Sequence, residues 1–329
     1  MSQVLKKTYV AFAGFFMAVV AQVNGIAADP FINNQWGAPS CCETPCCTPP
    51  TEIIVWGDVL YWRPELCGLE AAFGSTAIDT SVAGGIITTT ITESDEEPDG
   101  KWSPGFRIGA DVRLDCVDVV AAWTHYNGRA SFHSDSGHGS WKIHYDTIDL
   151  VLAKSWSLCP SVNVRPFIGV RGLRVHQTLS SHLETAFTSI IGNNTVITEL
   201  NDRENFAGAG PELGLEADFA FGCGFRVFGV FDVVSYYGSV KSRHAKTDTF
   251  TSTVSVCNGR KTGCFSTIGT DAAIGIIWDK TLCYCGCETD FFLKLSLEQH
   301  RIYDFSNLGS DGNLSLDGGS LGLGIGFSY

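Results

Sequence analysis

Thirteen cysteines are the residues of this chain best suited to covalent chemistry. In an oxidising compartment such thiols form disulfides, and an odd number leaves at least one thiol free or bonded to another molecule. Adjacent cysteines rarely bond to each other, because of the geometry that the bridge demands. We expect a disulfide network that joins copies of the chain to each other and to other proteins, with internal bridges as the alternative. The disulfide candidates are Cys41, Cys42, Cys46, Cys47, Cys116, Cys159, Cys223, Cys283, Cys285, Cys287, Cys257 and Cys264.

Two of these candidates, Cys257 and Cys264, are close enough in sequence to close a local loop by a disulfide. Thiolate ligation of zinc is a further alternative for Cys283, Cys285 and Cys287. Their spacing differs from the usual C-x₂-C pairs of zinc sites, so we expect no metal ion and no cofactor.

Hydrolytic chemistry is conceivable only in one polar stretch, which runs from His133 to Ser140 and is followed by His144. The stretch contains serine, histidine and aspartate, the residue types of a catalytic triad. Neighbours along one loop do not hold a triad geometry, however, and this stretch has no G-x-S-x-G strand-to-helix context. We expect no catalytic residue and no enzymatic activity.

Charged side chains alternate with apolar ones in several segments, so that they would share one face of a β-strand. On the inner wall of a barrel such groups either form ion pairs across a closed lumen or line a water-filled path that selects ions. The candidates for pore-lining residues are Arg107, Asp111, Arg113, Arg165, Arg171, Glu212, Glu216, Asp218, Arg226, Asp232, Lys294 and Glu298.

The elements that must position these groups are strands, and the last ten residues have the clearest pattern. Leu321, Leu323 and Ile325 alternate with glycine up to the terminal Tyr329. An apolar face opposite a face of very small residues is typical of the last strand of an outer-membrane β-barrel. An edge strand of a soluble sandwich is the alternative.

The N-terminal residues resemble an export signal. Lys6 and Lys7 precede an apolar run from Tyr9 to Val23, and Gly25-Ile26-Ala27 matches a cleavage site after residue 27. We expect residues 1–27 to be removed, 28–52 to form a periplasmic segment rich in Cys and Pro, and 53–329 to form a transmembrane β-barrel. No later apolar run reaches the ~18 residues of a spanning helix, so the chain would cross a membrane as strands.

Composition is consistent with this class of protein. Only 17% of residues are charged, and the formal net charge is −13. This acidity argues against a nucleic-acid partner.

The alternation predicts ten strands, which are separated by alternately short and long connections. An even number of strands places both ends of the barrel in the periplasm. Strand-like stretches in the long connections, at 81–92, 182–200 and 247–256, raise the possible count to sixteen unless they extend neighbouring strands. The turn at 280–288 is expected to be one of the short ones. The predicted strands span residues 54–63, 105–114, 117–127, 143–156, 162–175, 206–219, 224–236, 271–279, 290–299 and 319–329.

The segment Trp56–Glu70, WGDVLYWRPELCGLE, follows a short Cys/Pro-rich stretch. Together with the glycine-alternating final strand, it resembles the major outer-membrane porins of chlamydia-like bacteria and the related Legionella-type major outer-membrane proteins. The resemblance implies a porin that also stiffens the cell envelope through disulfide cross-links.

We therefore expect an all-β outer-membrane barrel of ten to sixteen strands that lets small hydrophilic solutes and ions diffuse passively. Its expected partners are outer-membrane lipid, these solutes and, through disulfides, itself and other envelope proteins. A plugged barrel that serves as an adhesin or a structural surface protein is the main alternative, and a barrel hydrolase is a further one.

Overall fold

A computed structural model describes residues 52–67, 75–83, 86–94, 99–114, 117–134, 137–189, 192–250, 253–284, 287–306 and 312–328. All of them belong to one compact unit, Cys46–Tyr329. The predicted export signal, and all of the predicted periplasmic segment except Glu52, lie outside the described residues.

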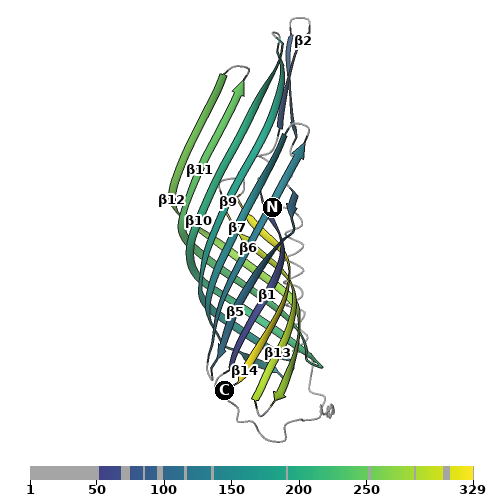
Figure 1. Cartoon of the computed structure of the whole chain (residues 1–329), viewed down its shortest axis with the longest axis vertical. Helices are drawn as coiled ribbons and strands as arrows, with labels where there is room; N and C mark the ends of the chain where they lie inside the picture. The colour runs from purple at the N-terminus through teal and green to yellow at the C-terminus, as the bar shows by residue number, and fades with distance from the viewer. Residues whose placement is uncertain are drawn as a thin grey trace. The chain divides into compact units, whose positions relative to one another are not determined.

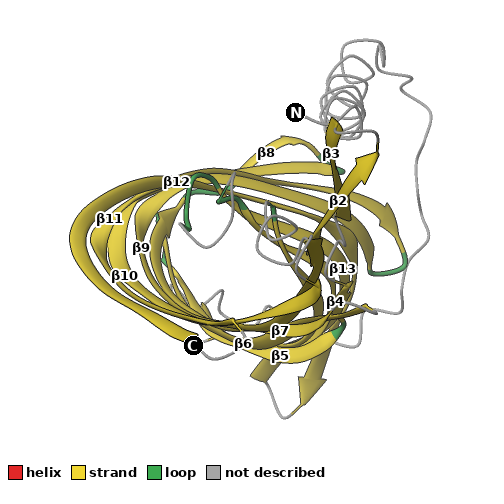
Figure 2. Cartoon of the chain, turned by 90° about the horizontal axis from the view of Figure 1, so that it is seen from above, coloured by secondary structure: helices red, strands yellow, loops and turns green. Residues whose placement is uncertain are grey.

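Ten antiparallel strands of the described chain close into a barrel, which Figure 2 shows from above. Pairing of the first strand with the last and of the fifth with the sixth completes the ring. The predicted fold class is therefore confirmed, with the smallest of the expected strand numbers. In order around the ring the strands are β1 (Glu52–Leu66), β5 (Ser103–Arg113), β6 (Asp118–Ser134), β7 (Gly137–Ala153), β9 (Val162–Ser189), β10 (Gly192–Gly222), β11 (Phe225–Phe250), β12 (Thr253–Tyr284), β13 (Cys287–Ile302) and β14 (Leu314–Ser328).

Four shorter strands are attached to the barrel wall. The hairpin β2 (Ser75–Ala83) and β3 (Ile86–Ser94) meets β9 in parallel where Ile78 pairs with Phe187. The strands β4 (Asp99–Lys101) and β8 (Trp156–Cys159) pair with β6 and β9. No helix long and apolar enough to cross a membrane occurs among the described residues.

Four neighbouring strands are much longer than a bilayer requires. β9, β10, β11 and β12 have 28, 31, 26 and 32 residues, whereas a tilted strand crosses a bilayer with ~9–11. They form a wall that rises beyond the rest of the barrel (Figure 1). The strand-like stretches 182–200 and 247–256 extend these strands and do not form additional membrane strands, which was one of the two expected alternatives. The stretch 81–92 instead forms most of the β2–β3 hairpin.

The short turns lie at the edge where Glu52 pairs with Ser328, which we name the turn edge. Between β10 and β11, Gly222, Cys223 and Gly224 all have positive φ, at 101°, 54° and 78°. A Cβ at Gly224 would lie 2.2 Å from the Asp279 carbonyl oxygen, so glycine is required there. The prediction of a turn over 280–288 was too long, because β12 continues to Tyr284 and β13 begins at Cys287.

Side chains of the barrel wall separate by strand alternation into an apolar outer face and a packed inner face. In β14, Leu321 and Leu323 are 59% and 55% exposed, whereas Gly322 and Gly324 are buried. Exposed apolar residues continue around the barrel, and we name this surface the apolar band. It includes Val55, Val59, Ile108, Ile148, Leu150, Leu152, Ile168, Val170, Leu213, Phe231, Val233, Ile276, Leu293, Leu295 and Leu297. Such a band is suited to contact with lipid.

The position of the apolar band can be tested with a charge at its centre. Leu295→Arg places a guanidinium on the outer face of β13 and should lower the free energy of unfolding by ~2–4 kcal/mol, because the charge loses its hydration in lipid. Urea unfolding in phospholipid vesicles measures this difference. As a control, Ser239→Arg on the exposed outer face of β11 above the band should stay within about 0.5 kcal/mol of the wild type. Equal effects of the two substitutions would contradict the assignment.

Candidate functional site

The interior of the barrel contains a cavity of about 610 Å³ that reaches the turn edge. Its lining includes Glu52 and Asp290 at that edge, and Trp62 and Tyr145 at the other end. The side chains that bear on function project into this space from nine of the ten barrel strands, all except β14, because every second residue of each strand points inward.

Arg171 is the centre of the largest charge cluster in the interior. Its guanidinium lies 2.6 Å from Glu212 and 3.4 Å from Asp232, and it also donates hydrogen bonds to Asp149 and Asp271. The four carboxylates come from β7, β10, β11 and β12, so one arginine on β9 draws together five strands. An unpaired buried charge is costly, and this arginine therefore fixes the positions of its partners.

A second cluster forms around Arg107, which binds Glu298 through two hydrogen bonds of 3.2 and 2.9 Å and lies 3.3 Å from Asp58. Lys294 lies 2.6 Å from the same Asp58 oxygen. His300 joins this cluster to that of Arg171, since its ring nitrogens lie 2.9 Å from Asp271 and 3.4 Å from Glu298. The charges at mid-height therefore form one connected network.

Further ion pairs lie nearer the turn edge. Arg165 lies 2.7 Å from Asp111, 3.0 Å from Asp118 and 3.7 Å from Glu216. Arg226 binds Asp218 and Asp279 at 3.0 and 3.3 Å, and Arg113 binds Glu52 at 3.0 Å.

The described interior is acidic overall. Its ion pairs join twelve carboxylates to six Arg or Lys side chains and to His300. An excess of carboxylate attracts cations and repels anions. The chemistry that this lumen can perform is therefore the retention or passage of cations.

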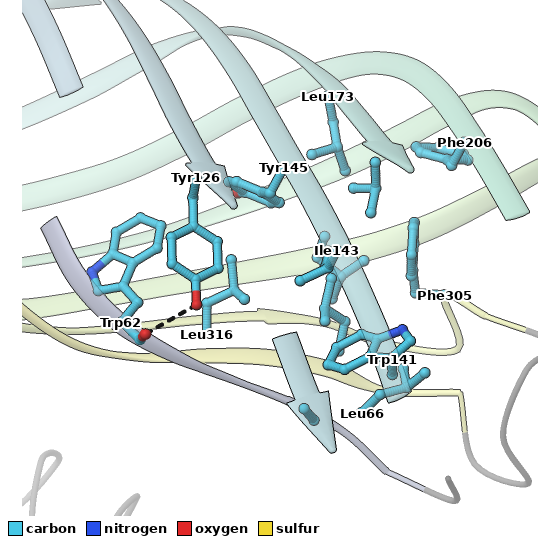
Figure 3. Packing of buried hydrophobic residues seen from close by; sticks show 14 of the residues in the cluster. Trp62, Leu66, Tyr126, Trp141, Ile143, Tyr145, Leu173, Phe206, Phe305 and Leu316 are labelled. Atoms are coloured by element: carbon cyan, nitrogen blue, oxygen red, sulfur yellow. Dashed lines mark hydrogen bonds between the residues drawn. The ribbon is translucent and has the colours of Figure 1, made fainter. Parts of the chain in front are cut away.

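A buried apolar cluster lies inside the barrel, on the side of the charge network away from the turn edge. Figure 3 shows the packing of its residues. We name this cluster the apolar plug. Its largest members are Trp62, Tyr126, Trp141, Tyr145, Phe206, Tyr236 and Phe305. The hydroxyl of Tyr126 donates a hydrogen bond of 2.9 Å to the Trp62 carbonyl oxygen, drawn as a dashed line in Figure 3.

Contacts within the apolar plug cross the lumen rather than follow its wall. The ring of Trp62 on β1 lies 6.4 Å from Tyr145 on β7 and 4.5 Å from His300 on β13, measured between centroids. Phe206 lies 5.4 Å from Phe305, which follows β13. None of these strand pairs are neighbours in the ring. The plug therefore packs side chains of non-neighbouring strands against one another inside the barrel.

The structure places eleven of the twelve pore-lining candidates on the wall of the cavity. The other candidate, Asp218, lies beside it in an ion pair with Arg226. Four residues that were not among the predicted pore-lining residues complete the charge network: Asp58, Asp149, Asp271 and His300. The alternation within their strands is nevertheless consistent with an inward position. The aromatic residues of the apolar plug were not predicted to lie in the lumen either.

The described cysteines lie at both edges of the barrel, and Cys159, Cys223, Cys257 and Cys264 form no disulfide with one another. Cys159 and Cys223 lie near the turn edge, Cys67 follows β1 at the opposite edge, and Cys257 and Cys264 lie in the extended part of β12. Of the other candidates, Cys283 is the last residue but one of β12 and Cys287 is the first residue of β13, and the rest lie outside the described residues.

The expected local disulfide between Cys257 and Cys264 is wrong. Both residues lie on the single strand β12 and are seven positions apart, which corresponds to ~23 Å at the rise of an extended strand. A disulfide requires Cα atoms within about 7 Å of each other. The two exposed thiols can therefore react only with other partners.

The polar stretch from His133 to Ser140 does not assemble a catalytic triad in its described residues. His133 and His138 face each other across the β6–β7 hairpin, with ring centroids 6.5 Å apart, on the outer surface of the barrel. Among the described residues, no group of three or more His, Cys, Asp or Glu is arranged to hold a metal ion.

A closed antiparallel barrel with an apolar outer band and an ion-paired interior defines a transmembrane barrel of the bacterial outer membrane. The chain belongs to the family described as Legionella pneumophila major outer membrane protein precursor, whose model matches residues 43–283, more than half of the chain. The resemblance to chlamydia-like porins remains a prediction. No curated protein sequence matches the chain.

Several solved structures are similar in fold. The outer membrane protease OmpT from Escherichia coli has a TM-score of 0.37 at 10% identity, with 85% of this chain and 96% of that chain covered. Ail, the attachment invasion locus protein of Yersinia pestis, has 0.26 at 11% identity, with 85% and 99% covered. The toluene transporter TodX of Pseudomonas putida has 0.31 at 9% identity, with 85% and 89% covered. At these scores the similarity says nothing about the activity of this chain.

The role of Arg171 can be tested by removing its charge. Arg171→Met leaves four carboxylates without their common partner and should lower the free energy of unfolding by ~3–5 kcal/mol. Arg113→Met, at an ion pair whose arginine is 44% exposed, should cost less than about 1 kcal/mol. Urea unfolding in vesicles compares the two variants.

If Arg171→Met does not refold, combining it with Asp271→Asn and Glu212→Gln should restore a folded barrel, because fewer unpaired charges remain. A cost no larger than that of Arg113→Met would contradict the role assigned to Arg171.

Proposed function

We propose that this protein is a closed barrel of the outer membrane that anchors a surface-exposed strand wall, and that it acts as a structural surface protein or adhesin. The observation that carries this proposal is the apolar plug, whose aromatic residues meet across the lumen. A barrel of about eight strands has an interior that side chains fill, whereas open channels occur with about sixteen or more. Ten strands are nearer to the first case.

The length of β9 to β12 supports the same function. Beyond the apolar band these strands present a broad polar surface, and their pairing remains regular to the pairs Ser189–Gly192 and Phe250–Thr253. A regular sheet holds surface residues in fixed positions, as recognition of a partner requires.

Passive diffusion of ions, the function first expected from the sequence, is the second candidate. The cavity of about 610 Å³ and its excess of carboxylates favour it. It requires the apolar plug to be displaced, and the resulting path would select cations.

Planar-bilayer conductance of protein purified from outer membranes distinguishes the two functions. The wild type should stay silent with and without reductant. Trp62→Ala, which shortens the side chain at the centre of the plug, should produce single-channel steps that favour cations, since the acidic cavity then connects the two sides. The change of gel mobility on heating, typical of folded barrels, shows whether the variant is folded.

Stable steps from the unmodified protein would refute the closed barrel and favour the porin. If Trp62→Ala is silent, the variant that also carries Phe206→Ala should conduct. Silence of that folded variant as well would refute the view that the plug is what closes the lumen.

Disulfide cross-linking is the second part of this proposal. Cys223, Cys257 and Cys264 are exposed, and an exported thiol without an internal partner is available to other molecules. Cys223 would bond partners on the periplasmic side, while Cys257 and Cys264 would bond partners outside the cell.

Non-reducing electrophoresis of outer membranes, with thiols blocked before lysis, tests the cross-links. We expect species larger than the monomer that disappear on reduction, and Cys223→Ser should remove a subset of them. The buried Ser296→Ala change, which touches no cysteine, serves as the control. A wild type that runs only as a monomer without reductant would contradict the cross-linking role.

A further inference from the structure

The histidines of this chain are concentrated on one part of the outer surface. Of eight histidines, six lie on β6, β7 and β9 with their side chains outward. His144 and His176 pair across β7 and β9, with stacked rings 5.8 Å apart, and His125 lies beside them on β6. We name these three the lower row. His133, His138 and His182 form an upper row farther from the turn edge.

The lower row lies directly beyond the apolar band. On β7, Ile148 is 66% exposed, and Asp146 and His144 are the next two outward residues. On β9, Val170 is 56% exposed and is followed by Gly172, Arg174 and His176 on the same face. Headgroups of the outer leaflet lie at the depth where the lipid-facing apolar residues end.

The wall is hollowed at this place. A cavity of about 340 Å³ is lined by His144, Asp146, Arg174, His176 and Asn205. Asn127 accepts a hydrogen bond from Nδ1 of His144, and Asn205 accepts one from Nδ1 of His176. These asparagines fix the ring orientation, so that the Nε2 atoms become donors when the rings are protonated.

The charged groups that face the lower row are mostly cationic. Arg129 on β6, Lys142 on β7, Arg174 on β9 and Arg203 on β10 are exposed on this face, and Asp146 is the carboxylate among them. Asp146 is engaged by His125 at 2.6 Å. This surface is suited to an anion with several acceptor oxygens, such as a phosphate group.

We propose that the lower row, together with Arg174 and Lys142, binds the phosphate groups of outer-leaflet lipid headgroups, and that this binding strengthens as the pH falls. Lipid is the occupant because the cavity continues the apolar band, so that one molecule can place its acyl chains on Val170 and Ile148 and its phosphate against His144 and His176.

The pH dependence follows from the protonation of these rings. His144 lies outside the membrane-spanning segments, and burial lowers its pKa, as do the neighbouring His176 and His125. A bound phosphate raises the pKa of the same ring, so the complex takes up protons that the free wall lacks. Affinity must then rise as the pH falls.

Native mass spectrometry of protein purified from outer membranes, with diphosphoryl lipid A as the probe, tests this proposal. We expect wild-type affinity to be about tenfold higher at pH 5.5 than at pH 7.5, because binding is coupled to proton uptake by the histidine rings. The variant His144→Gln, His176→Gln, Arg174→Gln should lose most of the binding and the pH dependence. Lipid A without its phosphates should bind weakly at both pH values.

A control variant removes a similar number of positive charges outside the proposed site. Arg260→Gln with Lys261→Gln removes two exposed cations from β12 and should leave binding unchanged. The proposal is overturned if dephosphorylated lipid A binds as well as the phosphorylated form, or if the three-residue variant retains wild-type affinity. Competition by millimolar inorganic phosphate alone would overturn the assignment to lipid and leave a site for free phosphate.

Discussion

The structure depends on the narrowness of a ten-stranded ring, because inward side chains on opposite strands come within contact distance of each other. A polar group on this inner wall is removed from bulk water and must find its partner in the lumen. Arg171 meets four carboxylates from four other strands for this reason. The same narrowness lets Trp62 reach Tyr145 and His300, so ion pairs and aromatic contacts across the lumen fix the shape of the barrel.

The lumen is divided into a charged part and an apolar part because placing charged groups among apolar side chains costs free energy. A buried ion pair is tolerated when further hydrogen bonds satisfy its atoms, and His300 supplies such bonds at the boundary by contacting both Asp271 and Glu298. Beyond it most inward residues are aromatic or aliphatic, and the buried polar residues among them include Gln177, Asp202 and Glu204. Gln177 accepts a hydrogen bond from Trp141, and Asp202 lies 2.6 Å from His244.

Much of the barrel could be predicted from the sequence, because alternation with a period of two assigns each residue of a strand to one face. Leu321 and Arg107 lie on the faces expected for them. The partners of Arg171 could not be predicted, since Asp271 is a hundred residues away and comes into reach only through the stagger of the closed ring. The glycines of β14 show a second feature that the sequence did not predict, which is the space left inside the lumen. An inward glycine leaves room in the lumen, yet the ring of Phe292 and the Cβ atom of Trp56 occupy the space beside Gly324.

The net charge of −13 conceals a separation of charge that the fold creates. Carboxylates outnumber cations inside the barrel, whereas exposed arginine, lysine and histidine residues lie outside on β6, β7 and β9 to β12. Alternation explains the separation, because Asp149 and Lys142 are seven positions apart on β7 and so point to opposite faces. A cation approaching from the turn edge therefore meets an attractive interior, and an anion at the outer leaflet meets an attractive wall. The net charge describes neither surface.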